Sequence, residues 1–295
     1  MTLHSLCVAP FADYGFMRRA LVASVALGVG GGPVGVLLVL RRMSLVSEAM
    51  SHAVLPGAAI GFLLAGSLSL AAMGLGALVA GLIVTFLSGL ITRTTSLKED
   101  ASFTSFYLSA MALGVLIVSL GGSNLDLLHV LFGTILAIDA QAVCIVAAIA
   151  SLTLIVLALV YRPFITECFD PLFLRVVGGR GSLYHFIFLL LLVLNLVAGF
   201  QTLGTLMAVG MMMLPACIAK LWTERLAVMF LIAAVSAAVS GFIGLLVSYH
   251  LGFASGPTII LTASVIYAIS LLVAPSGALG RLFRRRHFSN ARTEV

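Results

Sequence analysis

The stretch RRMSLVSEAMSHAVLPG (residues 41–57) decides how the rest of this 295-residue chain is interpreted. It places a carboxylate and an imidazole, those of Glu48 and His52, four residues apart. Side chains at positions i and i+4 share one face of a helix, with Cβ atoms about 5–6 Å apart, so both can reach the same ion. This spacing is typical of a two-ligand metal clip.

The rest of the chain is compatible with lipid. Hydrophobic residues make up 62% of it and charged residues only 9%, whereas soluble globular domains carry about 25% charged residues. The mean hydropathy is +1.23, and several apolar runs reach about 20 residues, the length that a helix needs to cross a bilayer. Alternating strands of the kind found in membrane barrels are absent from the sequence. The composition excludes a soluble protein and predicts an all-α, polytopic membrane protein.

Glu48 and His52 therefore lie in an unusual environment. An ionisable side chain at membrane depth costs about 2.5–3.5 kcal/mol on insertion scales, and such groups face a partner or a cavity. Pro56, which follows them, lacks a backbone N–H and is expected to loosen the helix next to His52.

The apolar runs predict about nine membrane-spanning helices, within a range of eight to ten. The expected spans are residues 16–40, 48–66, 68–92, 101–120, 140–161, 183–200, 203–221, 226–249 and 257–274. The first contains the run GVGGGPVG (28–35), which predicts either a kink or a close helix contact. A further apolar run before Asp139 is too short to cross and predicts a re-entrant or half-helix segment, with Asp139 starting the next helix.

The basic residues give the orientation. The net charge of +6 comes from residues at the ends of apolar runs and in the tail RLFRRRHFSNAR (281–292), as the positive-inside rule predicts for cytoplasmic loops. This placement argues against a nucleic-acid partner and puts the N-terminus outside, with Arg18 and Arg19 as exceptions to the charge rule. If the short segment crosses, the N-terminus moves inside. We divide the chain into an N-terminal tail (1–15), one transmembrane domain (16–275) and a basic cytoplasmic tail (276–295).

The longest polar interruption is expected to be a cytoplasmic docking surface. Asp170 before Pro171 is a favourable helix start, and Gly178 and Gly179 are a favourable helix end. A short helix over 171–177 is therefore predicted inside a loop at about 166–182. The alternative is a solvated linker. The four cysteines are widely separated, so we expect neither a disulfide framework nor a thiolate metal site, and interpret them as small apolar residues.

Several stretches, in this order, resemble one protein family. They are RRMSLVSEAMSHAVLPGAAIGFLLAG from residue 41, LKEDA (97–101), DLLHVLFGTILA (126–137), FDP with the glycine-rich loop after it (169–180), QTLGTLMAVGMMMLPACIAKL (201–221) and SGPTIILTA (255–263). Together they resemble the permease subunits of ATP-binding-cassette importers for zinc, manganese and iron, over about 16–275. In that family the acidic residue is commonly Asp, in a GDALSHA pattern, whereas this chain has Glu48 in SEAMSHA. The extra methylene moves the carboxylate by about one bond length, which affects coordination geometry and metal preference.

The resemblance implies a permease in a bacterial plasma (inner) membrane. Its expected partners are cytoplasmic ATP-binding subunits, an extracytoplasmic metal-binding protein, membrane lipid, and a second permease chain that is either identical or a related paralogue. No tightly bound cofactor is expected, since the divalent ion (Mn, Zn or Fe) is cargo. The sequence holds no GxxxxGK[ST] pattern, so we expect no enzymatic activity and a separate ATPase.

The resemblance also raises three sets of residues as candidate sites. Glu48 and His52 are the expected metal ligands, four in a symmetric dimer, and oxygen plus nitrogen ligands suit Mn, Fe or Zn. The alternative is a helix-capping Glu and a His hydrogen-bonded inside the bundle. Asp126 and His129 are a possible metal pathway on the outer side, or an interfacial polar pair. The third set is expected to insert into a groove of the ATPase and comprises Phe169, Asp170, Pro171, Gly178 and Gly179.

Two rival functions were weighed. A secondary, proton-coupled metal transporter would need intramembrane carboxylates as proton carriers, and Glu48 is the only one in or at the edge of the first three spans. An intramembrane hydrolase would need a Ser/His or HExxH arrangement, which the spans do not show. Met211, Met212 and Met213 are consecutive and point to different helix faces, so bundle packing is expected of them and not a soft-metal stripe.

Overall fold

A computed structural model describes residues 9–66, 69–95, 99–120, 138–169, 176 and 181–277. Within these ranges the chain forms helices and no strand, as predicted. The helices are α2 (Ala9–Asp13), α3 (Gly15–Leu40), α4 (Ser44–Ala53), α5 (Leu55–Ala65), α6 (Leu70–Thr94), α7 (Glu99–Leu120), α9 (Ala140–Leu159), α10 (Tyr161–Phe169), α12 (Gly181–Leu203), α13 (Thr205–Trp222), α14 (Leu226–Leu251) and α15 (Ser255–Val273).

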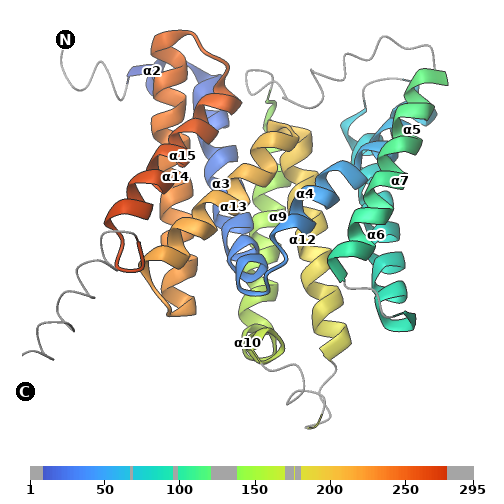
Figure 1. Ribbon diagram of the computed structural model, residues 1–295. Coiled ribbons are helices and arrows are strands. Elements are labelled where there is room, and N and C mark those ends of the chain that lie inside the picture. Colours follow the sequence, from blue (N-terminus) through green and yellow to red (C-terminus); the bar gives the residue numbers. More distant parts are fainter. Residues whose placement is uncertain are drawn as a thin grey trace, which may run out of the picture.

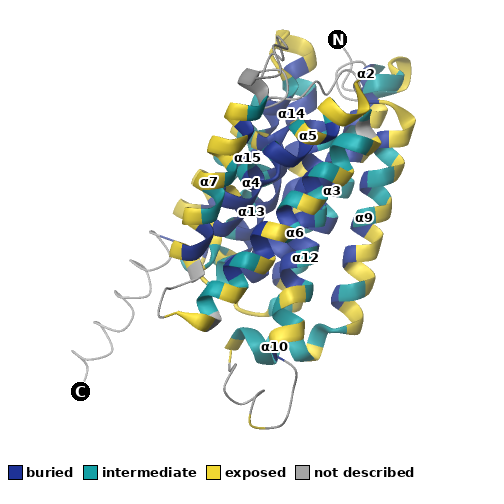
Figure 2. Cartoon of the chain, turned by 90° about the vertical axis from the view of Figure 1, so that its right-hand side faces the viewer, coloured by how far each residue is buried: buried dark blue, intermediate teal, exposed yellow. Residues whose placement is uncertain are grey.

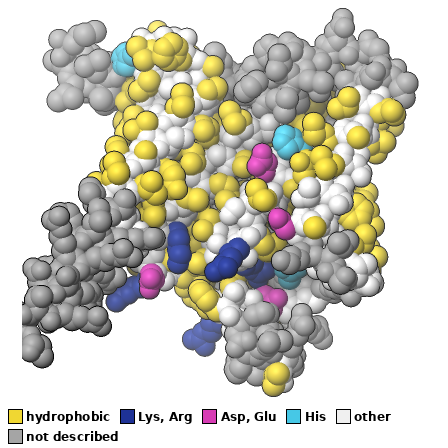
Figure 3. Space-filling view, viewed as in Figure 1, with side chains coloured by type: hydrophobic (Ala, Val, Ile, Leu, Met, Phe, Trp, Pro, Cys, Tyr) yellow, Lys and Arg dark blue, Asp and Glu magenta, His cyan; other side chains and the backbone are white. Residues whose placement is uncertain are grey.

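Among the described residues, 9 helical segments are long and apolar enough to cross a membrane, with α4 and α5 forming one segment. The predicted count of spans is confirmed. Figure 1 shows the helices running up and down one bundle, with α2 near the upper end and the last turn of α15 near the lower end. Lysine and arginine side chains gather toward that lower end in Figure 3, which is the distribution that the positive-inside rule expects of a cytoplasmic end.

Helix α3 lies at the centre of the larger part of the bundle, packed by α9, α12, α13 and α14 (Figure 1). Its glycine run is a region of close helix contact, one of the two predicted outcomes. A Cβ at Gly35 would collide with the backbone carbonyl of Met212 in α13, and one at Gly30 would lie 2.7 Å from Cα of Ala150 in α9. Small residues at these positions let the neighbouring backbones approach α3 closely.

The distribution of buried and exposed residues is the one expected of a helix bundle surrounded by lipid. In Figure 2 buried positions fill the interior of the bundle, and exposed positions line the outer faces of helices such as α7 and α9. The exposed side chains include many large apolar ones, for example Leu75, Phe86, Leu116 and Leu261. In a membrane such side chains contact lipid tails. Met211 and Met212 are buried, which fits their predicted role in packing.

Asp139 is the N-cap of α9, as predicted, and its carboxylate accepts a hydrogen bond from the N–H of Ala142 (2.7 Å). The half-helix predicted before it lies outside the described residues, apart from Ile138 and Asp139. The loop predicted to dock the ATPase is described only at its edges. Its beginning is already helical, since α10 covers residues that sequence reasoning assigned to the polar interruption.

Candidate metal site

The turn between α3 and α4 fixes where the candidate metal site begins. Arg41 is the C-cap of α3, and Arg42 follows it in the left-handed region with φ 59°. The N–H of Arg42 donates to the carbonyl of Val39 (3.2 Å), and the N–H of Met43 donates to that of Leu38 (3.0 Å). These two bonds form the Schellman pattern of helix ends. Because the turn is short and fully hydrogen-bonded, the end of α3 sets the direction of α4.

Helix α4 buries one face and exposes the other. Val46, Met50 and Ala53 on the buried face belong to the main apolar cluster of the bundle. Glu48 is exposed and His52 is half-buried, both on the opposite face. The two side chains therefore lie one turn apart on one face of one helix, as the sequence predicted.

Hydroxyl groups stabilise the inner side of the same helix without reaching the candidate ligands. Ser47 and Ser51 are buried, and their hydroxyls donate to the carbonyls of Ser44 (2.9 Å) and Glu48 (2.7 Å). The serines are thus satisfied within α4. Neither serine hydroxyl bonds to the Glu48 carboxylate or the His52 ring, so these two groups can bind a partner on the opposite face of α4.

The His52 ring lies beside an aromatic side chain of α7. Its centroid is 6.1 Å from that of Tyr107 in α7, with an interplanar angle of 30°. Within the described residues, no group of three or more His, Cys, Asp or Glu side chains is close enough to hold a metal ion. This part of one chain therefore offers two ligands, whereas transition metals take four or more.

The helix is interrupted directly after His52. Val54 is both the C-cap of α4 and the N-cap of α5, and Pro56 occupies the first turn of α5. Pro56 has no N–H to donate to the carbonyl of His52, four residues earlier, so the regular hydrogen-bond series stops beside the candidate ligand. The loosening predicted from Pro56 is seen as a separation of the span into two helices.

The other predicted site residues fall mostly outside the described residues. This applies to Asp126 and His129, and also to Asp170, Pro171, Gly178 and Gly179. Phe169 is described as the last residue of α10, with 67% of its surface exposed. An exposed apolar side chain therefore ends α10.

Sequence reasoning missed a polar cluster around Arg41. The Nε atom of Arg41 donates to Sγ of Cys168 in α10 (3.1 Å), and its Nη1 atom donates to Nδ1 of His185 in α12 (2.9 Å). The guanidinium carbon also lies 4.6 Å from the ring centre of Phe188. Cys168 had been interpreted as a small apolar residue. One sequence feature could have indicated this cluster: Cys168 and His185 flank the loop predicted to contact the ATPase.

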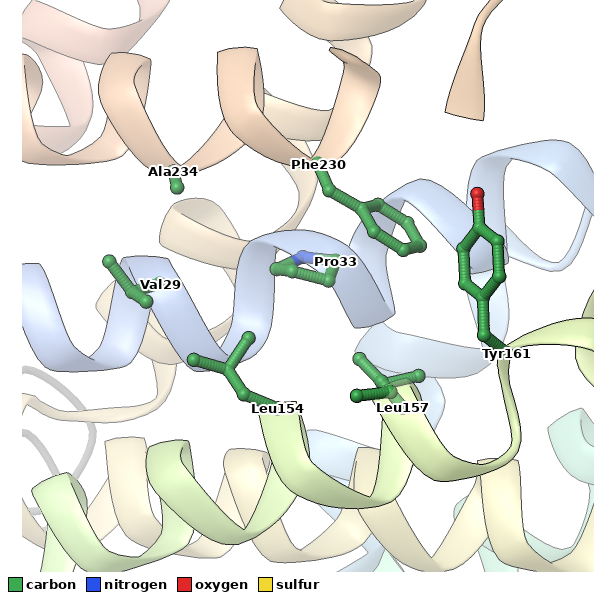
Figure 4. A pocket seen from close by; sticks show the side chains of 8 residues that line it. Val29, Pro33, Leu154, Leu157, Tyr161, Phe230 and Ala234 are labelled. Atoms are coloured by element: carbon green, nitrogen blue, oxygen red, sulfur yellow. The ribbon is translucent and has the colours of Figure 1, made fainter. Parts of the chain in front are cut away.

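An apolar cavity of about 210 Å³ lies elsewhere in the bundle, between α3, α9 and α14. Figure 4 shows Val29 and Pro33 of α3 facing Leu154 and Leu157 of α9, with Phe230 of α14 beyond them. Its lining also includes Ala158, Tyr161 and Ala234, and thus no charged side chain. This cavity offers no ligands to a divalent ion.

Comparison with known proteins gives consistent matches over nearly the whole chain. The model of the ABC 3 transport family matches residues 13–274. The manganese import system permease protein ScaB of Streptococcus parasanguinis is 35% identical over 263 residues, covering 89% of this chain and 92% of ScaB. The manganese transport system membrane protein MntC of Listeria innocua is 35% identical over 267 residues, covering 90% of this chain and 94% of MntC.

Two further similarities extend this picture. The chelated iron transport system membrane protein YfeD of Yersinia pestis is 33% identical over 270 residues, covering 92% of this chain and 89% of YfeD. Among solved structures, PsaBC from Streptococcus pneumoniae in complex with Fab aligns with a TM-score of 0.80 and 32% identity. That alignment covers 91% of this chain and 97% of the other.

Proposed function

Because the chain belongs to the ABC 3 transport family, we propose that it is the permease subunit of an ATP-driven importer of divalent transition metal ions. It is a multi-pass bacterial membrane protein. Its relatives ScaB and MntC are named for manganese import and YfeD for chelated iron. Manganese, iron and zinc are therefore the proposed cargo. These relatives favour the ATP-driven importer over a secondary, proton-coupled transporter.

The observation that carries the proposal is the exposed face of α4. Glu48 and His52 lie one turn apart on it, next to the helix interruption at Val54. Leu45, one turn before Glu48, is 61% exposed, so the described helices leave this part of the face open, while Tyr107 of α7 lies beside His52. A carboxylate at membrane depth would cost about 2.5–3.5 kcal/mol if it faced lipid. A second protein surface on this face removes that cost.

We infer that the second surface belongs to another permease chain, identical or paralogous. In a twofold dimer the same face of α4 meets its own copy, because such an interface is isologous. Two copies of Glu48 and His52 then supply two carboxylates and two imidazoles to one ion on the axis. The set of oxygen and nitrogen ligands suits Mn, Fe or Zn.

The energy for transport comes, in this proposal, from separate cytoplasmic ATPase subunits. We place their contact at the loop 166–182, which starts from the exposed side chain of Phe169 at the end of α10. Asp170, Pro171, Gly178 and Gly179 are proposed to shape the docking element. An extracytoplasmic binding protein would deliver the ion at the other end, where Asp126 and His129 are proposed to line the entry. The permease would expose the Glu48 and His52 site alternately to the two sides.

The test is transport by the assembled complex in lipid nanodiscs or proteoliposomes. The permease is combined with its cognate ATPase and binding protein, and ATP-dependent accumulation of Mn, Zn and Fe isotopes is measured. We expect Glu48→Ala and His52→Ala to abolish accumulation. Matched controls at exposed positions, Glu224→Ala and His250→Ala, are expected to transport normally.

Two results would contradict the proposal. Wild-type accumulation by well-expressed Glu48→Ala and His52→Ala variants would remove these residues from the ion path. Uptake that needs no ATPase and collapses when the proton gradient is dissipated would identify a secondary transporter instead.

A further inference from the structure

The Arg41 cluster joins three parts of the molecule that are far apart in the sequence. Arg41 ends α3, and α4 with its candidate metal ligands starts three residues later. Its hydrogen-bond partners are Cys168 near the end of α10 and His185 in the first two turns of α12. Helix α10 leads into the proposed ATPase-docking loop and α12 leads out of it. One guanidinium therefore touches both flanks of that loop.

The turn after Arg41 makes this connection stiff. The two Schellman hydrogen bonds, from the N–H groups of Arg42 and Met43, close the end of α3 and leave little freedom before α4 begins. A displacement of α10 and α12 that pulls on the Arg41 side chain would thus act at the base of α4. Glu48 lies one turn beyond that base.

Two buried polar atoms, one on Arg41 and one on the residue before Cys168, lack hydrogen-bond partners within the described part of the chain. Among the residues that the structure describes, neither Nη2 of Arg41 nor Oε2 of Glu167 has a hydrogen-bond partner, although both atoms are buried. Buried polar atoms without partners are costly, and a charged one more so. Glu167 precedes Cys168 in α10, and a Cβ at Gly181 would lie only 2.5 Å from its Oε2 atom. The carboxylate thus lies against the first residue of α12.

Charge chemistry indicates which partner is missing. A guanidinium can only donate, so Nδ1 of His185 is the acceptor in this hydrogen bond. A thiol sulfur is a weak acceptor, whereas a carboxylate binds a guanidinium with two parallel, charge-assisted hydrogen bonds. Glu167 offers the stronger partner one residue away from Cys168. Neighbouring residues of a helix point about 100° apart, so the exchange needs new rotamers of the long Arg41 and Glu167 side chains together with a displacement of α10.

We propose that Arg41 is a positioning residue that couples the ATPase-docking loop to the metal-site helix, by exchanging Cys168 and His185 for Glu167 as its partners. The inference rests on the proposed function and deepens it, because it names the link between ATP hydrolysis and the Glu48 and His52 site. The two states differ in the position of α10 relative to the base of α4. If Arg41 had a purely structural role, it would instead keep the same hydrogen-bond partners during the whole transport cycle.

The test uses the complete complex with its ATPase and binding protein, and compares Arg41→Gln, Glu167→Gln and Arg41→Lys with the wild type. Three quantities are measured: ATP hydrolysis, metal ions transported per ATP, and Mn²⁺ binding by the complex. We expect Arg41→Gln and Glu167→Gln to retain Mn²⁺ binding and ATP hydrolysis. Transport per ATP should fall by about tenfold, within the usual range of coupling between distant sites. Arg41→Lys keeps the charge and a donor group but not the planar fork of the guanidinium, and should recover part of the lost transport.

Arg42→Gln is the matched control, since it removes the same charge from the next residue, whose side chain is exposed. It should leave transport per ATP unchanged.

The proposal is overturned if Arg41→Gln and Glu167→Gln transport as many ions per ATP as the wild type. It is also overturned if Arg41→Gln lowers thermal stability, hydrolysis and transport in proportion, because that pattern identifies a purely structural role. Should Arg41→Gln fail to assemble, Glu167→Gln alone decides, since it is nearly isosteric and the Oε2 atom of Glu167 has no hydrogen-bond partner among the described residues. Failure of the proposed function is distinct, because then the wild-type complex itself accumulates no metal.

Discussion

Replacing Gly57 with alanine should destabilise the bundle next to the candidate metal site. Gly57 lies in the first turn of α5, and a Cβ there would collide with the backbone carbonyl of Gly76 in α6 and lie 2.6 Å from Cβ of Ala80. The contact is reciprocal, since a Cβ at Gly76 would collide with the carbonyl of Gly57. These neighbours are backbone atoms or a methyl group, so no flexible side chain can move aside. Helices α5 and α6 would have to separate.

Two opposing effects set the size of the change. Overpacking of this kind costs about 1–3 kcal/mol, and the backbone contact places Gly57→Ala toward the upper end. Alanine also favours the helix over glycine by about 1 kcal/mol. We therefore expect a net loss of about 1–2 kcal/mol in the free energy of unfolding. Gly89 in α6 is the matched control, because a Cβ there meets nothing within 4 Å. Gly89→Ala should gain up to about 1 kcal/mol.

The assay is the thermal or detergent-induced unfolding of the purified permease, with Mn²⁺ binding measured in parallel. Because only the interruption at Val54 separates α5 from α4, a tilt of α5 should also weaken Mn²⁺ binding in Gly57→Ala. Gly89→Ala should bind normally. If the two alanine variants shift the midpoint in the same direction by the same amount, close packing at Gly57 does not hold α5 and the reasoning is refuted.

Three further predictions concern single positions. Glu48→Asp shortens the carboxylate side chain by one methylene and should change the ratio of Mn to Zn uptake by about tenfold, the lower end of what loss of an outer-shell partner does to metal affinity. An unchanged ratio in a competition assay would remove Glu48 from the coordination sphere. Arg42→Gly should stabilise the permease by about 1 kcal/mol, because it relieves a left-handed non-glycine residue with φ 59°, and a lowered unfolding midpoint would contradict this. Asn195→Ala should cost about 0.6–1.7 kcal/mol, since its buried amide donates to Oγ1 of Thr153 and the carbonyl of Leu191; a neutral effect on unfolding would show that this interhelical bond contributes nothing.

The spans were predictable because lipid is a simple solvent. Each crossing needs a long apolar run with its backbone satisfied internally, so hydropathy alone places helices such as α9 and α14 to within a few residues. The placement of Glu48 and His52 on one helix face followed from helical periodicity and also needed no tertiary information. The Asp139 cap of α9 was local in the same sense, since its partner Ala142 is three residues away.

The parts that depend on distant contacts could not be read from the sequence. Helix α10 was hidden in a stretch that looks polar, because Phe164 is its only fully buried residue. The Phe164 ring packs against Tyr184 of α12 with ring centres 6.5 Å apart. The Arg41 cluster needs α10 and α12 to converge on the end of α3, and no local pattern encodes that convergence. Pro56 indicated a weakened helix, but the position of the interruption at Val54 also reflects the tight packing of α5 on α6.

The most direct test of the account is to detect the ligands of a bound ion. Mn²⁺ is added to the purified permease complex, and pulsed electron paramagnetic resonance measures the coupling of the manganese electron spin to histidine nitrogen. The account predicts coupling to two equivalent nitrogens in the wild type, lost in His52→Gln and retained in His250→Gln. Nitrogen coupling that survives His52→Gln unchanged would show that the ion binds elsewhere, and the shared Glu48 and His52 site would be wrong.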